Sequence, residues 1–214
     1  MKTYKIHLIR HGKTAANLNG VYIGHTDMPL SPEGLSELLE MKKTYVYPGA
    51  ARFFTAPLSR CRQTLQVLYP DAKQEIVEGL TECDFGDWEN KSIVQLKSDP
   101  AFLSWMEGTQ TEIPHGESTV NFQKRVTKAF EGVVEELMRS GDTEAVVCTH
   151  GGVIMMLMMT YALPRLKMGD CVVNPGNGFT LRITPSVWMR EPVAEALCMI
   201  PWEREKGSVY RIFG

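Results

Sequence analysis

Two residues with complementary chemistry, Arg10 and His11, stand side by side where a short apolar run meets a glycine. The run, residues 6–9, predicts a buried strand, and the residues after Gly12 can open a helix. In an α/β sheet such a place favours an anion, because free backbone N–H groups and the helix dipole face it. Arg10 offers donors that fit phosphate oxygens, and His11 offers a nucleophilic nitrogen near pH 7. The pair therefore predicts phosphoryl chemistry.

The same stretch also matches the end of a nucleotide-binding P-loop at Gly12, Lys13 and Thr14. That motif needs another glycine five positions earlier, where this chain has His7 inside the predicted strand. A chain that is still extended there has no loop to wrap around phosphates. The P-loop interpretation is therefore set aside.

Two further turns between a strand and a helix carry cationic or nucleophilic side chains. Arg60 lies in the first turn of the helix expected after a strand at 52–55, and His150 follows a strand at 145–148. The carboxyl ends of parallel strands share one rim of a sheet, so we expect these residues to meet Arg10 and His11 there. Such a group would stabilise the charge on a phosphoryl group in transfer. A histidine nucleophile needs no metal.

The remaining pattern indicates the layers around that sheet. Helices are expected from Pro32 to about residue 43, where Ser31 can cap the first turn, and along the apolar stripe from about 116 to 141. Late strands are expected at residues 171–173, 179–184 and 193–200. We predict a single domain over residues 1–214, a three-layer αβα sandwich whose mostly parallel sheet has an antiparallel edge strand. A small lid is expected to be inserted at about 85–115.

Composition excludes several classes of protein. The 214 residues suit one domain, and a net charge of -2 provides no basic field for nucleic acid. The apolar stretch 145–163 is broken by a turn at 149–152, which indicates a buried strand and helix rather than a membrane span. Five scattered cysteines and the lack of an export signal favour a reduced, cytoplasmic protein. No metal-ligand spacing is present, and we expect no metal and no cofactor.

An acidic segment at residues 77–89 places Glu82, Asp84 and Glu89 among aromatic residues and glycines. Such clusters are often solvated loops, yet a carboxylic acid near a phosphate site could protonate a leaving group. Sequence spacing alone does not choose among these three carboxylates.

Four motifs resemble those of the histidine phosphatase superfamily, the phosphoglycerate mutase-like group. Residues 8–17 resemble its R-H-G-x-T signature, and residues 55–64 resemble its S-x-L-x-R-x-x-x-T motif. Residues 80–88 are similar to its acid-bearing L-x-E-x-x-F-G-x-W segment, and residues 146–153 to its second histidine motif. The motifs occur in the family order and cover most of residues 5–160.

The resemblance implies a role for each matched residue. It makes His11 the nucleophile that forms a phosphohistidine and Glu82 the proton donor, with Asp84 and Glu89 left as alternative acids. The phosphoryl oxygens would be bound by Arg10, Arg60, His150, Asn17, the backbone around Gly24, and Gly151. Asn90 replaces a glycine that is frequent in the family, so the resemblance does not define the conformation of the lid. It also assigns no role to His25 or His115.

The function that the resemblance implies is a metal-independent phosphatase acting on small phosphomonoesters through a phosphohistidine. The α-ribazole phosphatase-like and broad-specificity branches are the nearest models. Phosphoglycerate mutase-type phosphoryl transfer is one alternative, and a non-catalytic phosphate-binding module is another. The expected partner is a small phosphorylated metabolite, with no nucleic acid and no membrane. The sequence defines neither the substrate nor the oligomeric state.

Overall fold

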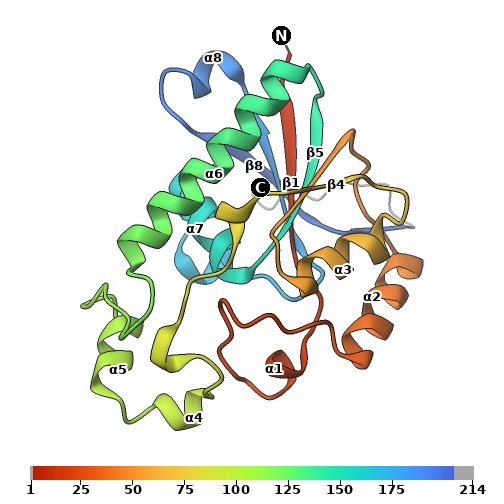
Figure 1. The fold of residues 1–214 in the computed structure, drawn as a ribbon. Helices are drawn as coiled ribbons and strands as arrows, with labels where there is room; N and C mark the ends of the chain where they lie inside the picture. The colour runs from red at the N-terminus through yellow and green to blue at the C-terminus, as the bar shows by residue number, and fades with distance from the viewer. Residues whose placement is uncertain (1, 205–214) are drawn as a thin grey trace.

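A seven-stranded sheet forms the centre of the protein (Figure 1). The computed structural model describes residues 2–204. The strand order is β4-β3-β5-β1-β7-β8-β6, and β2 and β9 form a separate antiparallel pair. The strands are β1 (Tyr4–Arg10), β2 (Tyr45–Val46), β3 (Arg52–Thr55), β4 (Gln74–Ile76), β5 (Glu144–Thr149), β6 (Ala162–Leu163), β7 (Gly178–Ile183), β8 (Ala194–Ile200) and β9 (Trp202–Glu203).

Helices cover both faces of this sheet (Figure 1). One layer holds α2 and α3; the other holds α6, α7 and α8, which share ring contacts among Phe130, Tyr161 and Trp188. The helices are α1 (Ala15–Leu18), α2 (Pro32–Thr44), α3 (Ser59–Leu68), α4 (Ile93–Leu96), α5 (Pro100–Met106), α6 (Thr119–Ser140), α7 (Gly151–Tyr161) and α8 (Pro185–Trp188), with 3₁₀ turns η1 (Glu78–Leu80), η2 (Gly86–Trp88) and η3 (Met168–Cys171). The predicted α/β fold is confirmed.

The sequence pattern accounts for the central elements. Because helices cover both faces, β1 and β5 are buried almost throughout; β5 has the apolar run 145–148 at its centre, and β1 has Ile6, Leu8 and Ile9. The apolar stripe of α6 is buried against the sheet, Ser118 caps its first turn, and Gly141 ends it with φ of 82°. The stretch 145–163 contains β5, a turn, α7 and β6. Between residues 2 and 204 no helix is both long and apolar enough to cross a membrane.

The late strands differ from the prediction in two respects. The antiparallel strand β7 lies inside the sheet, between β1 and β8, and the edges are β4 and the two-residue β6. The strand expected at residues 171–173 is absent, and a 3₁₀ turn, η3, occupies residues 168–171 instead. Gly169 and Asp170 precede this run and Pro175 follows it closely, so three apolar residues are too few to extend into a strand.

The segment 85–115 contains η2, α4 and α5 and lies beyond the carboxyl ends of the parallel strands (Figure 1). Edge-to-face and tilted contacts between aromatic rings pack the segment internally and against Tyr22. The participating rings are those of Tyr22, Phe85, Trp88, Phe102 and Trp105. That this segment acts as a lid of a single domain stays a prediction.

Candidate active site

The sheet order brings three strand ends together. β3, β5 and β1 are neighbours and run parallel, and Arg10 pairs in register with Thr149. The next residues, His11 and His150, therefore lie side by side, with ring centroids 5.2 Å apart and planes inclined by 67°. Arg60 follows β3 in the first turn of α3 and donates from Nε to His150 Nδ1 at 3.3 Å. The predicted convergence of these four side chains is present in the structure.

His11 is buried and is held in one tautomer. Its Nδ1 lies 2.7 Å from the carbonyl oxygen of Gly12, which can only accept, so the proton resides on Nδ1 and Nε2 keeps its lone pair. Burial, together with the positive charge of Arg60, lowers the pKa of His11 to about 3. A histidine with this pKa is neutral at physiological pH, as a nitrogen nucleophile must be.

Two guanidinium groups flank the histidines, that of Arg60 fully buried and that of Arg10 partly buried. Arg60 is 0% exposed and donates to the carbonyl oxygens of Gly24 and Thr26, both at 2.8 Å. Arg10 donates to the carbonyl oxygen of Val173 at 2.7 Å, and its buried Nε has no partner. Across residues 2–204 neither group forms an ion pair with a carboxylate. Since buried charge is costly unless paired, the arrangement favours a bound anion.

His150 is fully buried at the N-terminal end of α7. Its Nδ1 accepts from Arg60, which leaves the proton on Nε2, where it can be donated. Burial, followed by the neighbouring His11, holds the pKa of His150 well below its usual value. The Cys61 sulfur lies 3.5 Å from Nε2 and packs against the imidazole. His150 is thus a neutral donor beside two cations.

Glu82 lies in the loop between η1 and η2 and is 8% exposed. Its Oε1 accepts from Cys83 N at 3.0 Å and its Oε2 from Gly152 N at 2.9 Å. Burial raises the pKa of Glu82, although both hydrogen bonds and the arginines oppose the shift. A Cβ atom on Gly152 would lie 2.4 Å from Oε1, so the close approach of α7 to this carboxyl group requires glycine.

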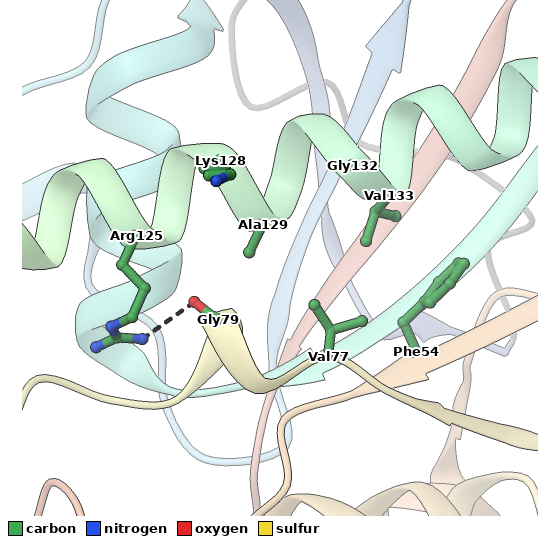
Figure 2. A pocket seen from close by; sticks show the side chains of 8 residues that line it. All are labelled: Phe54, Val77, Gly79, Arg125, Lys128, Ala129, Gly132 and Val133. Atoms are coloured by element: carbon green, nitrogen blue, oxygen red, sulfur yellow. Dashed lines mark hydrogen bonds between the residues drawn. The ribbon is translucent and has the colours of Figure 1, made fainter.

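The backbone on either side of Glu82 is fixed by Arg125 of α6. Its guanidinium donates to the carbonyl oxygens of Gly79 (3.0 Å), Thr81 (2.9 Å) and Glu82 (3.1 Å), and pairs with Glu117. Figure 2 shows the Gly79 contact at one end of a groove of about 570 Å³ between α6 and η1. This groove contains none of the predicted phosphate-binding residues.

Asn17, Gly24 and Gly151 occupy supporting positions. Asn17 Oδ1 accepts from the backbone N–H and hydroxyl of Thr14, which leaves only its amide hydrogens for a ligand. The Gly24 N–H already donates to Glu89 at 2.7 Å, and its carbonyl oxygen accepts from Arg60. A Cβ on Gly151 would lie 3.2 Å from Arg10 Nε. Direct phosphate binding by these three residues stays a prediction.

Two contributors, Thr64 and Arg125, were not assigned a role in the site from the sequence, and a third, Glu89, was assigned a different one. Thr64 accepts from Gly12 N at 2.9 Å and donates to the Arg60 carbonyl at 2.6 Å, which ties β1 to α3. The sequence pattern predicts Arg125 only as a polar residue of an amphipathic helix. Glu89 was identified only as an alternative acid, yet both of its oxygens accept from the loop at residues 24–26.

The two remaining histidines near these loops are exposed. His25 lies 3.8 Å from Asp84, and His115, with φ of 56°, lies 3.0 Å from Asp87. In the part of the chain that the structure describes, no three His, Cys, Asp or Glu side chains are placed to hold a metal.

Comparisons with known proteins identify the family and the fold. The family model of the histidine phosphatase superfamily (branch 1) matches residues 6–186. The chain is 29% identical over 160 residues to an adenosylcobalamin/alpha-ribazole phosphatase of Salmonella typhimurium, covering 72% of this chain and 77% of that protein. It is 27% identical over 162 residues to a broad-specificity phosphatase of Saccharomyces cerevisiae, covering 72% and 68%. A phosphoglycerate mutase structure from Thermus thermophilus superposes with a TM-score of 0.69 at 26% identity, covering 92% and 98%.

Proposed function

Because the chain belongs to the histidine phosphatase superfamily, we propose that it is a metal-independent phosphatase that hydrolyses small phosphomonoesters through a phosphohistidine on His11. One observation carries the proposal. A buried, neutral imidazole with a free Nε2 lies beside the buried guanidinium of Arg60 and the partly buried one of Arg10, neither of which has a carboxylate partner in residues 2–204. A phosphoryl group provides both the missing anion and the electrophile for such a set of residues.

In the first half-reaction, His11 Nε2 attacks phosphorus and the bond to the leaving oxygen breaks. Arg10, Arg60 and the Nε2–H of His150 bind the non-bridging oxygens, whose charge they stabilise. Glu82, protonated, gives its proton to the departing alkoxide, so the alcohol leaves neutral. The enzyme then carries a phosphohistidine and a Glu82 carboxylate.

In the second half-reaction, water attacks the phosphorus of the phosphohistidine. The Glu82 carboxylate takes a proton from this water, and the bond between phosphorus and Nε2 breaks. His11 returns to its neutral form and inorganic phosphate departs. Glu82 ends protonated, ready for the next turnover.

Release of phosphate from 4-nitrophenyl phosphate tests the proposal. We expect turnover to persist in excess EDTA, because the two arginines supply the positive charge that a metal would otherwise provide. Vanadate should inhibit competitively as a mimic of five-coordinate phosphorus. Loss of activity on chelation, restored by a divalent cation, would contradict a metal-independent mechanism. Tight binding of phosphate without any turnover would indicate the non-catalytic module instead.

We expect hydrolysis to exceed mutase activity. A mutase must retain a highly charged phosphoglycerate while the product is rephosphorylated, and extra cations near the site serve that purpose. The segment 85–115 contains no arginine, and its two lysines, Lys91 and Lys97, are exposed. Parallel assays of 3-phosphoglycerate isomerisation and phosphomonoester hydrolysis give the ratio of the two rates. Faster isomerisation would favour the mutase function, as in the Thermus relative.

A further inference from the structure

The position of Arg60 depends on a loop with little regular structure. Two of its three hydrogen bonds go to the carbonyl oxygens of Gly24 and Thr26, whereas the third goes to His150. Residues 22–29 contain no helix or strand, so no ladder of backbone bonds fixes these two carbonyls. Something else must hold the loop if Arg60 is to stay in place.

Glu89 provides that restraint from the opposite side of the loop. Its Oε1 accepts from the backbone N–H groups of Gly24 (2.7 Å), His25 (3.0 Å) and Phe85 (3.2 Å). Its Oε2 accepts from the Thr26 hydroxyl at 2.6 Å and from the Thr26 N–H at 3.4 Å. The loop thus donates N–H groups to the carboxylate of Glu89 and presents carbonyl oxygens to the guanidinium of Arg60.

We propose that Glu89 is a positioning residue, which acts through the loop 24–26 to hold Arg60 where it binds the phosphoryl group. This inference rests on the proposed phosphatase function. A carboxylate that accepts five hydrogen bonds draws the N–H groups toward itself, and the polarised peptides accept more strongly from the guanidinium. Arg60 then keeps one orientation while its charge remains available to substrate.

This role predicts a signature that differs from acid catalysis. A proton donor matters most for poor leaving groups, whereas a residue that positions a phosphate-binding arginine matters equally for all esters. Glu89→Gln keeps the shape of the side chain but replaces one accepting oxygen by a donor. We expect it to raise the inhibition constant of inorganic phosphate by roughly tenfold to a hundredfold, since charge-assisted bonds are lost.

The experiment compares this variant with Thr26→Val, which removes the hydroxyl that donates to Glu89 at 2.6 Å and accepts from the Asn90 amide at 3.3 Å, and with the control Asp87→Asn. Asp87 lies two residues away, is exposed, and contacts His115 rather than the loop. Thr26→Val should raise the inhibition constant of phosphate by only about threefold, because the four backbone N–H bonds to Glu89 remain, and Asp87→Asn should not raise it. In Glu89→Gln and in Thr26→Val, kcat/KM should fall by the same factor for 4-nitrophenyl phosphate as for an alkyl phosphate. In an Arg60→Ala background, Glu89→Gln should change phosphate inhibition by less than about twofold.

Unchanged phosphate inhibition in Glu89→Gln, with or without a lower melting temperature, would overturn the inference. So would a loss confined to the alkyl phosphate, or full additivity with Arg60→Ala. If Glu89→Gln does not fold, Thr26→Val decides by the same criteria. A wild-type protein that neither binds phosphate nor turns over phosphomonoesters would instead overturn the proposed function itself.

Discussion

Replacing His11 by alanine is expected to lower kcat for phosphomonoesters by roughly 10⁴-fold or more, the scale seen when a nucleophile is removed. The loss is large because the Nε2 of His11, which keeps its lone pair, is the atom that attacks phosphorus in the proposed mechanism. Phosphate binding should survive in part, since Arg10, Arg60 and His150 remain. Binding and turnover are therefore expected to separate in this variant.

Trapping of labelled phosphate on the protein measures the intermediate directly. The wild type should retain label through an acid-labile, base-stable linkage, and His11→Ala should retain none. His115→Ala is the matched control, because His115 is exposed and bonded only to Asp87. Persistent acid-labile label in His11→Ala would identify another nucleophile, of which His150 is the nearest.

Replacing Glu82 by glutamine should reduce the rate by roughly a hundredfold or more for an alkyl phosphate, the range of general acid catalysis. The loss for 4-nitrophenyl phosphate should be much smaller, because its phenolate leaves without a proton. Asp84→Asn, two residues away, should show no such difference between the substrates. Equal losses on both substrates in Glu82→Gln would assign Glu82 a positioning role and reopen the search for the acid.

The pH dependence of kcat/KM in the wild type follows from the protonation states of Glu82 and His11. Glu82 must be protonated to act as acid, and burial raises its pKa, so kcat/KM for an alkyl phosphate should fall as pH rises through that raised pKa. His11 must be neutral, and its pKa of about 3 places the acidic limb near pH 3. The alkaline limb should disappear in Glu82→Gln, while the acidic limb remains.

The sequence predicted those features that depend on local pattern. The apolar stretches of β1 and β5 are short and are followed by Arg10–His11 and by Thr149–His150, so the sequence indicated both the strands and where they end. Parallel strands then dictated that their carboxyl ends converge. The choice of Glu82 over its neighbours came from the family resemblance, and its burial against α7 agrees with that choice.

Features set by contacts between distant segments could not be read from the chain. Thr64 bonds Gly12 across 52 residues, Arg125 bonds the Glu82 carbonyl across 43, and Glu89 bonds Gly24 across 65. Arg125 and Glu89 are ordinary residue types at their places in the sequence, and Thr64 ends the second family motif but has no local pattern that indicates its bond to Gly12. The interior place of β7 has the same origin, because strand order depends on the whole sheet.

The position of β5 between β1 and β3 also constrains how the site can form during folding. β3 pairs with β5 rather than with β1, and β5 begins more than 80 residues after β3 ends. A nascent chain that lacks β5 therefore has no strand to join β1 to β3, and contacts outside the sheet, such as that of Gly12 with Thr64, are left to bring α3 toward β1. Such non-local pairing is slow because the loop entropy is lost before the contacts form. A chain that ends before β5 also lacks His150, which follows this strand, so the complete group of Arg10, His11, Arg60 and His150 can assemble only after β5 has been made.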